Sequence, residues 1–316
     1  MPFWQQDVRE MKGSIGMPHL ANGQHAAFAR RARAFSLLEL LVVIAISAIV
    51  IAIALPSLSS ARESAHIAVC LSNIRELGQT SAAYIEDAGL PTEPWHLGFD
   101  YSGGAIEKVS EYVYGGFQAE LDHPVLGDKL DTQKIHTNER PYNKYIAPGI
   151  CNGPVDTYIC PSDRFTATTK IEAPCSQPVV NNTPSWMING NSYSLNWNWL
   201  DAPPWNSKLA YYTKIWDMSA AGREMLRLKV GGSASKFVLF MENPMNAYMQ
   251  DAKPPSGSHG TSCQTQLGVG WHKQVSRYSV GFFDGHAAHR FIDTRYSSGP
   301  GYETWPEPYT LSGFNP

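Results

Sequence analysis

The chain has 316 residues, of which 43% are hydrophobic and 17% charged, and its formal net charge is −3. This length and composition indicate one or two domains and at least one buried core. The sequence contains no long basic run and no stripe of aromatic residues interleaved with Lys or Arg, so nothing in it indicates a nucleic-acid partner.

The first element in the chain is a long apolar run. Residues 40–55 contain no charged residue, and Ser47 is the only polar one among them. Counted from Phe35, the run approaches the ~20 residues with which a helix spans a ~30 Å hydrocarbon core. Three arginines lie immediately before it: Arg30, Arg31 and Arg33. The positive-inside rule therefore predicts a single-pass protein with residues 1–34 in the cytoplasm and the bulk of the chain across the membrane.

A cleaved secretory signal is one alternative, because Ala52 and Ala54 have the small-x-small spacing of a cleavage site. The length of the run, the carboxylate of Glu39 near its start and a helical pattern that continues past Pro56 argue against it. A plain uncleaved anchor is the second alternative.

The helical pattern continues after Pro56. Small and apolar residues recur at spacings of three and four, which predicts one stripe of a helix, whereas polar residues such as Glu63 and Asn73 fall mostly elsewhere. The stripe consists of Leu58, Ala61, Ala65, Ala68, Leu71, Ile74, Gly78, Ser81 and Ile85. We expect the helix to end near residues 87–89, with Pro91 beyond as a breaker, and residues 57–89 to pack on the rest of the protein.

Residues 90–316 predict a loop-rich, antiparallel β domain, so that the fold class is α+β. The runs 237–241 and 278–283 are β-branched and aromatic, and Pro, Gly, Asn and Ser cluster between such runs. Asp284 and Gly285 lie between the runs 280–283 and 286–292 and predict a hairpin with a two-residue type I′ turn.

Several histidines and a carboxylate near this hairpin could form a metal or catalytic cluster: His272, Asp284, His286 and His289. Imidazole and carboxylate are competent ligands. No HExxH, paired CxxC or nucleophile elbow accompanies them. We therefore expect no enzymatic activity and name no catalytic, cofactor-binding or metal-ligating residue.

Five cysteines fit a domain outside the cytoplasm, where disulfides persist: Cys70, Cys151, Cys160, Cys175 and Cys263. Their odd number leaves at least one of them free or linked between chains. Cys151 and Cys160 could close a short loop.

Four tryptophans lie in a region rich in Pro and Asn: Trp197, Trp199, Trp205 and Trp216. Exposed aromatic rings can stack on sugars or on partner surfaces. The alternative function for the globular part is therefore a membrane-tethered carbohydrate-binding or adhesion module, although packing in a core explains the same residues.

The segment Ala34-Phe35-Ser36-Leu37-Leu38-Glu39, followed by an apolar helix and Pro56, resembles the class III signal of type IV prepilins and type II secretion pseudopilins. This resemblance implies a pilin-like fold. It also implies that a prepilin peptidase cuts between Ala34 and Phe35 and methylates the new amino terminus of Phe35. Glu39 then becomes the fifth mature residue and Pro56 the twenty-second. The family usually has Gly before the cut, where this chain has Ala34.

The resemblance also gives Glu39 a role in assembly. The cleaved α-amino group of Phe35 lies four residues before Glu39, so the two charges can neutralise each other within one chain or between neighbouring subunits. The alternative is that the carboxylate of Glu39 only reaches interfacial water.

A second resemblance covers most of the remaining chain. It is to a pseudopilin-like group with a C-terminal, processing-associated domain named for a His, nine residues and an Asp-Gly pair. The matching residues include Cys70, Asn73, Cys160, Pro161, His272, Asp284 and Gly285. Eleven residues, 273 to 283, intervene here between the His and the Asp-Gly pair. The two cysteines in these motifs, Cys70 and Cys160, are the second pairing that the sequence leaves open, and it would tie the helix to the β domain.

Together the resemblances imply a structural subunit of a type II secretion pseudopilus or of a type IV pilus-like fibre. The expected partners are the prepilin peptidase, other pilin or pseudopilin subunits, an inner-membrane assembly platform and secreted cargo. The expected location is the bacterial inner membrane, with the C-terminal domain in the periplasm or on a fibre. No cofactor is expected, and calcium is the alternative because some pseudopilins bind it through loop carboxylates and carbonyls.

Overall fold

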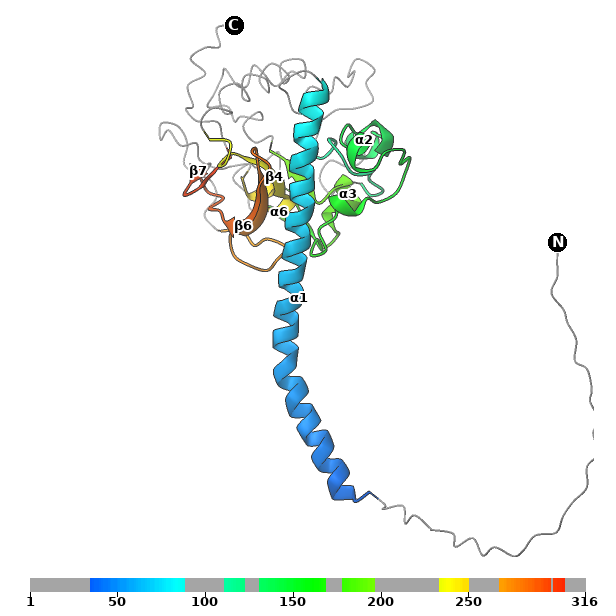
Figure 1. The fold of residues 1–316 in the computed structure, drawn as a ribbon, viewed down its shortest axis with the longest axis vertical. Coiled ribbons are helices and arrows are strands. Elements are labelled where there is room, and N and C mark those ends of the chain that lie inside the picture. Colours follow the sequence, from blue (N-terminus) through cyan, green and yellow to red (C-terminus); the bar gives the residue numbers. More distant parts are fainter. Residues whose placement is uncertain are drawn as a thin grey trace, which may run out of the picture. The chain divides into compact units, whose positions relative to one another are not determined.

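The computed structural model describes residues 35–88, 111–122, 131–168, 178–196, 233–249, 267–296 and 298–304. In these ranges the chain forms a long apolar helix followed by antiparallel sheets (Figure 1), so the predicted α+β fold class is confirmed and is consistent with a pilin-like fold. The chain divides into two compact units, Met1–Ala54 and Leu55–Pro316.

After Phe35 and Ser36, the described part of the first unit belongs to helix α1, which runs from Leu37 to Ala88. Residues 37–54 are all exposed, and α1 is long and apolar enough to cross a membrane. The one polar residue of the apolar run, Ser47, donates its hydroxyl to Val43 O at 2.8 Å. This bond within the helix leaves no unsatisfied hydroxyl on a segment suited to lipid.

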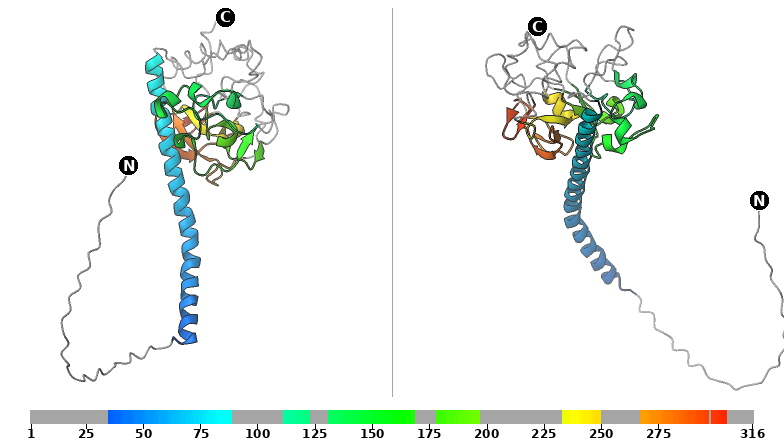
Figure 2. Two further views of the ribbon diagram at one scale, coloured as in Figure 1. Left: turned by 90° about the vertical axis from the view of Figure 1, so that its right-hand side faces the viewer. Right: turned by 45° about the horizontal axis from the view of Figure 1, so that its top comes forward.

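The second unit is built on a four-stranded antiparallel sheet with the strand order β3-β4-β5-β6. The strands are β3 (Tyr193–Leu195), β4 (Val238–Glu242), β5 (Arg277–Phe282) and β6 (Ala287–Phe291). The predicted runs 237–241 and 278–283 thus correspond to β4 and β5, each shifted by one residue at either end. Figures 1 and 2 show the part of α1 that belongs to this unit beside the sheet.

Short elements surround the sheet. Two further strand pairs are β1 (Thr166–Thr168) with β2 (Val179–Asn181), and β7 (Ser298–Gly299) with β8 (Tyr302–Glu303). The remaining α-helices are α2 (Asn143–Ile146), α3 (Ser185–Asn189) and α6 (Asn243–Met249). Three 3-10 helices are η3 (Asp131–Gln133), η4 (Thr137–Glu139) and η5 (Asp156–Tyr158).

The hairpin between β5 and β6 exists, but its predicted turn type is wrong. Phe282 N–H donates to His286 O and Gly285 N–H donates to Phe282 O, so three residues form the loop. Gly285 has φ 87°, whereas Asp284 is not among the non-glycine residues with positive φ. A type I′ turn needs positive φ at both central positions; a three-residue loop needs it only at the last, where Gly285 stands.

Helix α1 packs on the face of the sheet that carries Gly281. A Cβ at Gly281 would lie 2.5 Å from Ile74 Cγ2, so the helix approaches the strand closely where β5 has no side chain. Ile74 and Leu77 of α1 are buried in one core cluster with Phe240 of β4. A second cluster contains the alternate residues Tyr278, Val280 and Phe282 of β5, which point to the opposite face.

The predicted stripe on α1 is correct in its later turns and wrong in its earlier ones. Ile74, Gly78 and Ser81 are buried, but Leu58, Ala61, Ala65 and Ala68 are exposed. The covered face begins instead with the partly buried residues Glu63 and His66 and continues to Cys70. The periodicity search missed this part because polar residues occupy the covered positions.

Candidate functional site

The start of α1 is closed by a capping box. Leu38 N–H donates to Ser36 Oγ at 3.3 Å, and Ser36 N–H donates to Glu39 Oε2 at 2.9 Å. Such reciprocal bonds satisfy N–H groups that the first helical turn leaves without partners. Glu39 therefore has a partner within its own chain before any cleavage. The S-x-x-E spacing of residues 36–39 is the sequence signal for this cap, and our sequence analysis did not use it.

The side chains around the predicted cut are open to solvent. Phe35 is 80% exposed and Glu39 is exposed as well. Ala34, on the other side of the predicted cut, lies outside the described residues. Among described residues, this segment offers an accessible aromatic residue and a carboxylate one helical turn apart.

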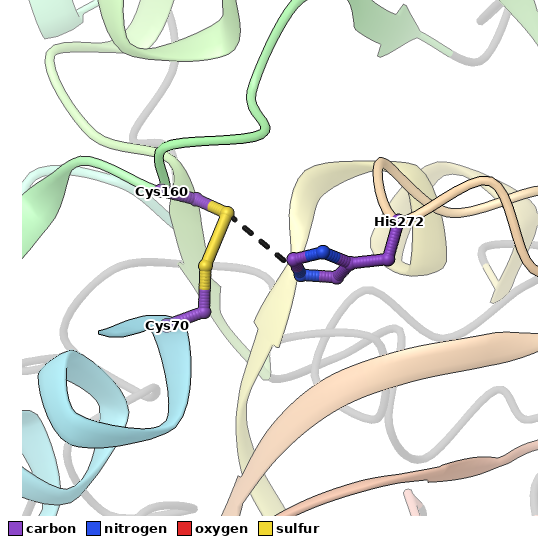
Figure 3. Close-up of side chains that lie close together, drawn as sticks. All are labelled: Cys70, Cys160 and His272. Carbon is purple, nitrogen blue, oxygen red and sulfur yellow. Dashed lines mark hydrogen bonds between the residues drawn. A yellow bond between two sulfur atoms is a disulfide. The ribbon is translucent and has the colours of Figure 1, made fainter. Parts of the chain in front are cut away.

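Helix α1 is joined covalently to the β domain by a disulfide between Cys70 and Cys160 (Figure 3). Both cysteines are buried and belong to the larger core cluster. Cys151 is a free, exposed cysteine, so it does not pair with Cys160 in this structure. The remaining two cysteines, Cys175 and Cys263, lie outside the described residues.

His272 is buried beside this disulfide (Figure 3). Its Nε2 lies 3.9 Å from Cys160 Sγ and 3.3 Å from Glu242 Oε1, and its Nδ1 lies 2.6 Å from Glu63 Oε1. Burial alone would lower the pKa of His272, but the hydrogen bonds and charges of Glu242 and Glu63 outweigh it and raise the pKa above its ordinary value. The imidazole thus connects α1 to the end of β4.

Glu63 of α1 also takes part in a second set of polar contacts. Ser162 donates its hydroxyl to Glu63 Oε1 at 2.7 Å, and His66 Nδ1 lies 3.0 Å from the same hydroxyl oxygen. Burial would raise the pKa of Glu63, but the hydrogen bonds from Ser162 and His272 and the charge of His272 lower it. Glu63 is therefore an ionised acceptor at the edge of the buried cluster.

Two further ionisable groups complete the cluster from the sheet. Glu242 Oε1 accepts a hydrogen bond from Ser279 N–H at 2.8 Å. Ser279 pairs across the sheet with His289 of β6, and its hydroxyl lies 3.2 Å from His289 Nδ1. The rings of His272 and His289 meet edge to face, with centroids 5.2 Å apart. Burial lowers the pKa of His289 below its ordinary value.

The cluster suggested by the sequence is therefore only partly assembled. The structure brings His272 and His289 together, but Asp284 and His286 pair with each other at 2.5 Å on the exposed hairpin. Sequence reasoning missed Glu63 and Glu242 as members. Their signals were a polar residue on a covered helix position and a carboxylate directly after the predicted apolar run 237–241.

Other residues of the family-like motifs hold the surrounding loops. Asn73 donates its side-chain N–H groups to Ile159 O at 3.0 Å and to Asp156 O at 3.3 Å. Asp163 accepts hydrogen bonds from Ser185 N–H, Trp186 N–H and the Ser192 hydroxyl. Burial of this carboxyl outweighs these bonds and raises the pKa of Asp163 to about 7. These contacts fix the segment around Cys160 against α1 and α3.

The four tryptophans on which the carbohydrate-binding alternative rests lie in residues 197–232, outside the described part of the chain.

Pro161, another of the motif residues, follows Cys160 in a turn and is exposed.

Comparison with known families gives one match. Residues 29–55 match the model of the prokaryotic N-terminal methylation motif. The comparison with curated proteins gave no match, and neither did the comparison with solved structures. The matched residues cover the arginine cluster, the predicted cut, the capping box and the whole apolar run to Leu55. The chain therefore carries a prepilin-type N-terminal motif at the head of a long apolar helix, which fits a membrane-anchored, pilin-like precursor.

Proposed function

We propose that this chain is the precursor of a pseudopilin or pilin-like subunit, which assembles into a type II secretion pseudopilus or a type IV pilus-like fibre. The observation that carries the proposal is the match of residues 29–55 to the N-terminal methylation motif, at the start of an exposed apolar helix. The motif implies processing by a prepilin peptidase and assembly with other pilin subunits. In this scheme the peptidase cuts between Ala34 and Phe35 and methylates Phe35.

The proposal divides the chain by task. Residues 1–34 are the cytoplasmic leader, and residues 35–56 anchor the subunit in the inner membrane. Residues 57–89 carry the helix into the domain formed by residues 90–316, which lies in the periplasm or on the fibre. The buried positions of Ile74 and Leu77 and the disulfide of Cys70 support this division, because they fix the second half of α1 to the β domain.

The capping box suggests how processing changes the state of Glu39. In the uncut chain, Glu39 accepts a hydrogen bond from Ser36 N–H. Cleavage adds a positive α-amino group on Phe35, one residue before this donor. A carboxylate in lipid is costly until it finds a cation, so Glu39 then pairs with an α-amino group of its own chain or of a neighbouring subunit. Pairing between subunits would set the register of helices in the fibre.

The β domain has a structural role in this proposal, and no catalytic step is assigned to it. Asn73 of α1 and Cys160 and Asp163 of the β domain make hydrogen bonds or a disulfide that hold loops in place. We include the resemblance to the processing-associated domain, with its His272 and Asp284-Gly285 pair, in the proposal. The assembly platform and the secreted cargo are its remaining expected partners.

Replacement of Glu39 by Gln tests this function. The variant is expressed in cells with a prepilin peptidase and a fibre-assembly system, and the membrane and sheared-fibre fractions are compared. Glu39→Gln should insert into the membrane as wild type does, but its amount in fibres should fall at least several-fold. Glu86→Gln is the matched control, because Glu86 is an exposed glutamate on the same helix. Incorporation of Glu39→Gln at the wild-type level would defeat the proposal.

A further inference from the structure

Three side chains from separate parts of the second unit converge beside α1: Glu242 at the end of β4, His272 in the turn before β5, and His289 on β6. One potential ligand atom from each lies within 4.8 Å of the others. His272 Nε2 and Glu242 Oε1 are 3.3 Å apart. Two ligand atoms bound at about 2.1 Å to one tetrahedral Zn²⁺ ion lie roughly 3.4 Å apart, so the hydrogen-bonded spacing of this pair is also close to that of two ligands of one ion.

One atom of each group has a supporting contact, and the remaining atoms are Glu242 Oε2, His289 Nε2 and His272 Nε2, the last of which lies 3.3 Å from Glu242 Oε1. His272 Nδ1 contacts the Glu63 carboxylate, His289 Nδ1 contacts the Ser279 hydroxyl, and Glu242 Oε1 accepts Ser279 N–H. In metal sites, a ligating imidazole commonly donates its second N–H to a carboxylate or another oxygen, which fixes the ring and the tautomer. Glu63 and Ser279 occupy the positions of such supporting groups.

Two buried polar atoms of the three proposed ligands have no hydrogen-bond partner among described residues. Among described residues, neither Glu242 Oε2 nor His289 Nε2 has a hydrogen-bond partner, and the Glu242 side chain is fully buried. A buried carboxylate oxygen without a donor is costly, and native structures rarely contain one without a reason. A Cβ at Gly270 would lie 3.2 Å from Glu242 Oε2, so glycine at this position keeps the space next to that oxygen open.

We propose that Glu242, His272 and His289 bind one divalent transition-metal ion of the Zn²⁺ class. Two imidazole nitrogens and one carboxylate oxygen suit this class better than calcium, which prefers six to eight oxygen ligands. The divalent charge would also offset the two carboxylates of Glu242 and Glu63, which lie on either side of His272. This inference does not depend on the proposed function.

The ion would act as a structural cross-link. It joins β4, β6 and the turn before β5, and the Glu63–His272 contact extends that link to α1. The two cysteines of the disulfide belong to a competing ligand set, because Cys70, Cys160 and His272 also have ligand atoms within 4.8 Å of one another. With the two sulfurs bonded to each other, neither is a thiolate, so the oxidised protein binds the ion through Glu242, His272 and His289.

The experiment uses the full-length chain, purified in detergent without reductant and stripped of metal with a chelator. Zn²⁺ is added and the excess is removed. Bound zinc is then measured by inductively coupled plasma mass spectrometry. Wild type should retain about one ion per chain and melt at a higher temperature than the stripped protein. Glu242→Gln and His289→Gln should each lose the ion, and Glu63→Gln should bind about 10- to 100-fold more weakly. His286→Gln is the control and should bind as wild type does, because His286 lies on the exposed hairpin.

Co²⁺ in place of Zn²⁺ identifies the ligands by spectroscopy in the wild-type chain. This measurement does not depend on how the variants fold. The absorption and X-ray fine structure of the Co²⁺ form should show two imidazoles and no sulfur. Failure of wild type to retain zinc, retention of zinc by His289→Gln, or a thiolate-to-cobalt band in the oxidised protein would each overturn the assignment.

Discussion

Replacing Cys70 and Cys160 together by Ala removes the covalent link between α1 and the β domain. The two cysteines are 90 residues apart in sequence. Without the disulfide the unfolded chain regains the entropy that loop closure had removed. For a loop of this length, the unfolding free energy should fall by about 4–5 kcal/mol at 25 °C. Both sulfurs are buried, so the cavities left by Ala add to this loss. The double variant is chosen because a single replacement would leave a reactive thiol.

Urea unfolding of the full-length chain in detergent, followed by near-ultraviolet circular dichroism, measures this loss. Cys151→Ala is the control, since Cys151 is exposed and unpaired, and its unfolding free energy should stay within about 0.5 kcal/mol of wild type. Reduction of wild type should reproduce most of the effect of the double variant. A double variant within about 1 kcal/mol of wild type would refute the reasoning, because the cross-link would then not constrain the unfolded chain.

Three further predictions concern packing, pH and the helix cap. Gly281→Ala should cost about 1–3 kcal/mol of unfolding free energy, because the new methyl group meets Ile74 Cγ2. Ile74→Ala removes Cγ2, so the loss in the double variant should be smaller than the sum of the two single losses. Thermal melts of the three variants check this, and strictly additive losses would contradict it. The pKa of Asp163 is about 7 in the folded chain and 3.8 in its ordinary state, so its contribution to stability is complete below about 3.8 and is lost as the pH rises through about 7. The melting temperature of wild type should therefore fall more between pH 5 and 8 than that of Asp163→Asn, and parallel curves would exclude the effect. Ser36→Ala should weaken the first turn of α1 by about 0.5–2 kcal/mol, seen as faster hydrogen exchange at Leu38, and unchanged exchange there would show that the cap is not formed.

The helix and the main strands could be predicted because their signals are local. The apolar run and the spacing of residues after Pro56 predict one helix, and it ends at Ala88, within the stretch where its end was expected. Strands β4 and β5 follow from β-branched and aromatic runs. The turn between β5 and β6 was predicted with the wrong loop length, because an Asp-Gly pair fits a three-residue loop as well as a two-residue one.

The buried cluster could not be predicted, because its members come from distant parts of the chain. Glu63 and His272 are 209 residues apart in sequence and 2.6 Å apart in the fold. A search for apolar periodicity discards Glu63 as a surface residue, although its covered position is what makes it informative. Glu242 carried only one local signal, its place directly after the predicted apolar run 237–241.

The amino terminus of the mature protein tests the central claim most directly. The chain is expressed with a prepilin peptidase, recovered from the membrane, and its N-terminal peptide is sequenced by mass spectrometry. Our account predicts a chain that begins at Phe35 and carries one methyl group on its α-amino nitrogen. Ala34→Gly should give the same product, and a bulky residue in Ala34→Leu should block it. A chain that retains residues 1–34, or one that is cut after Ala54, would contradict the account.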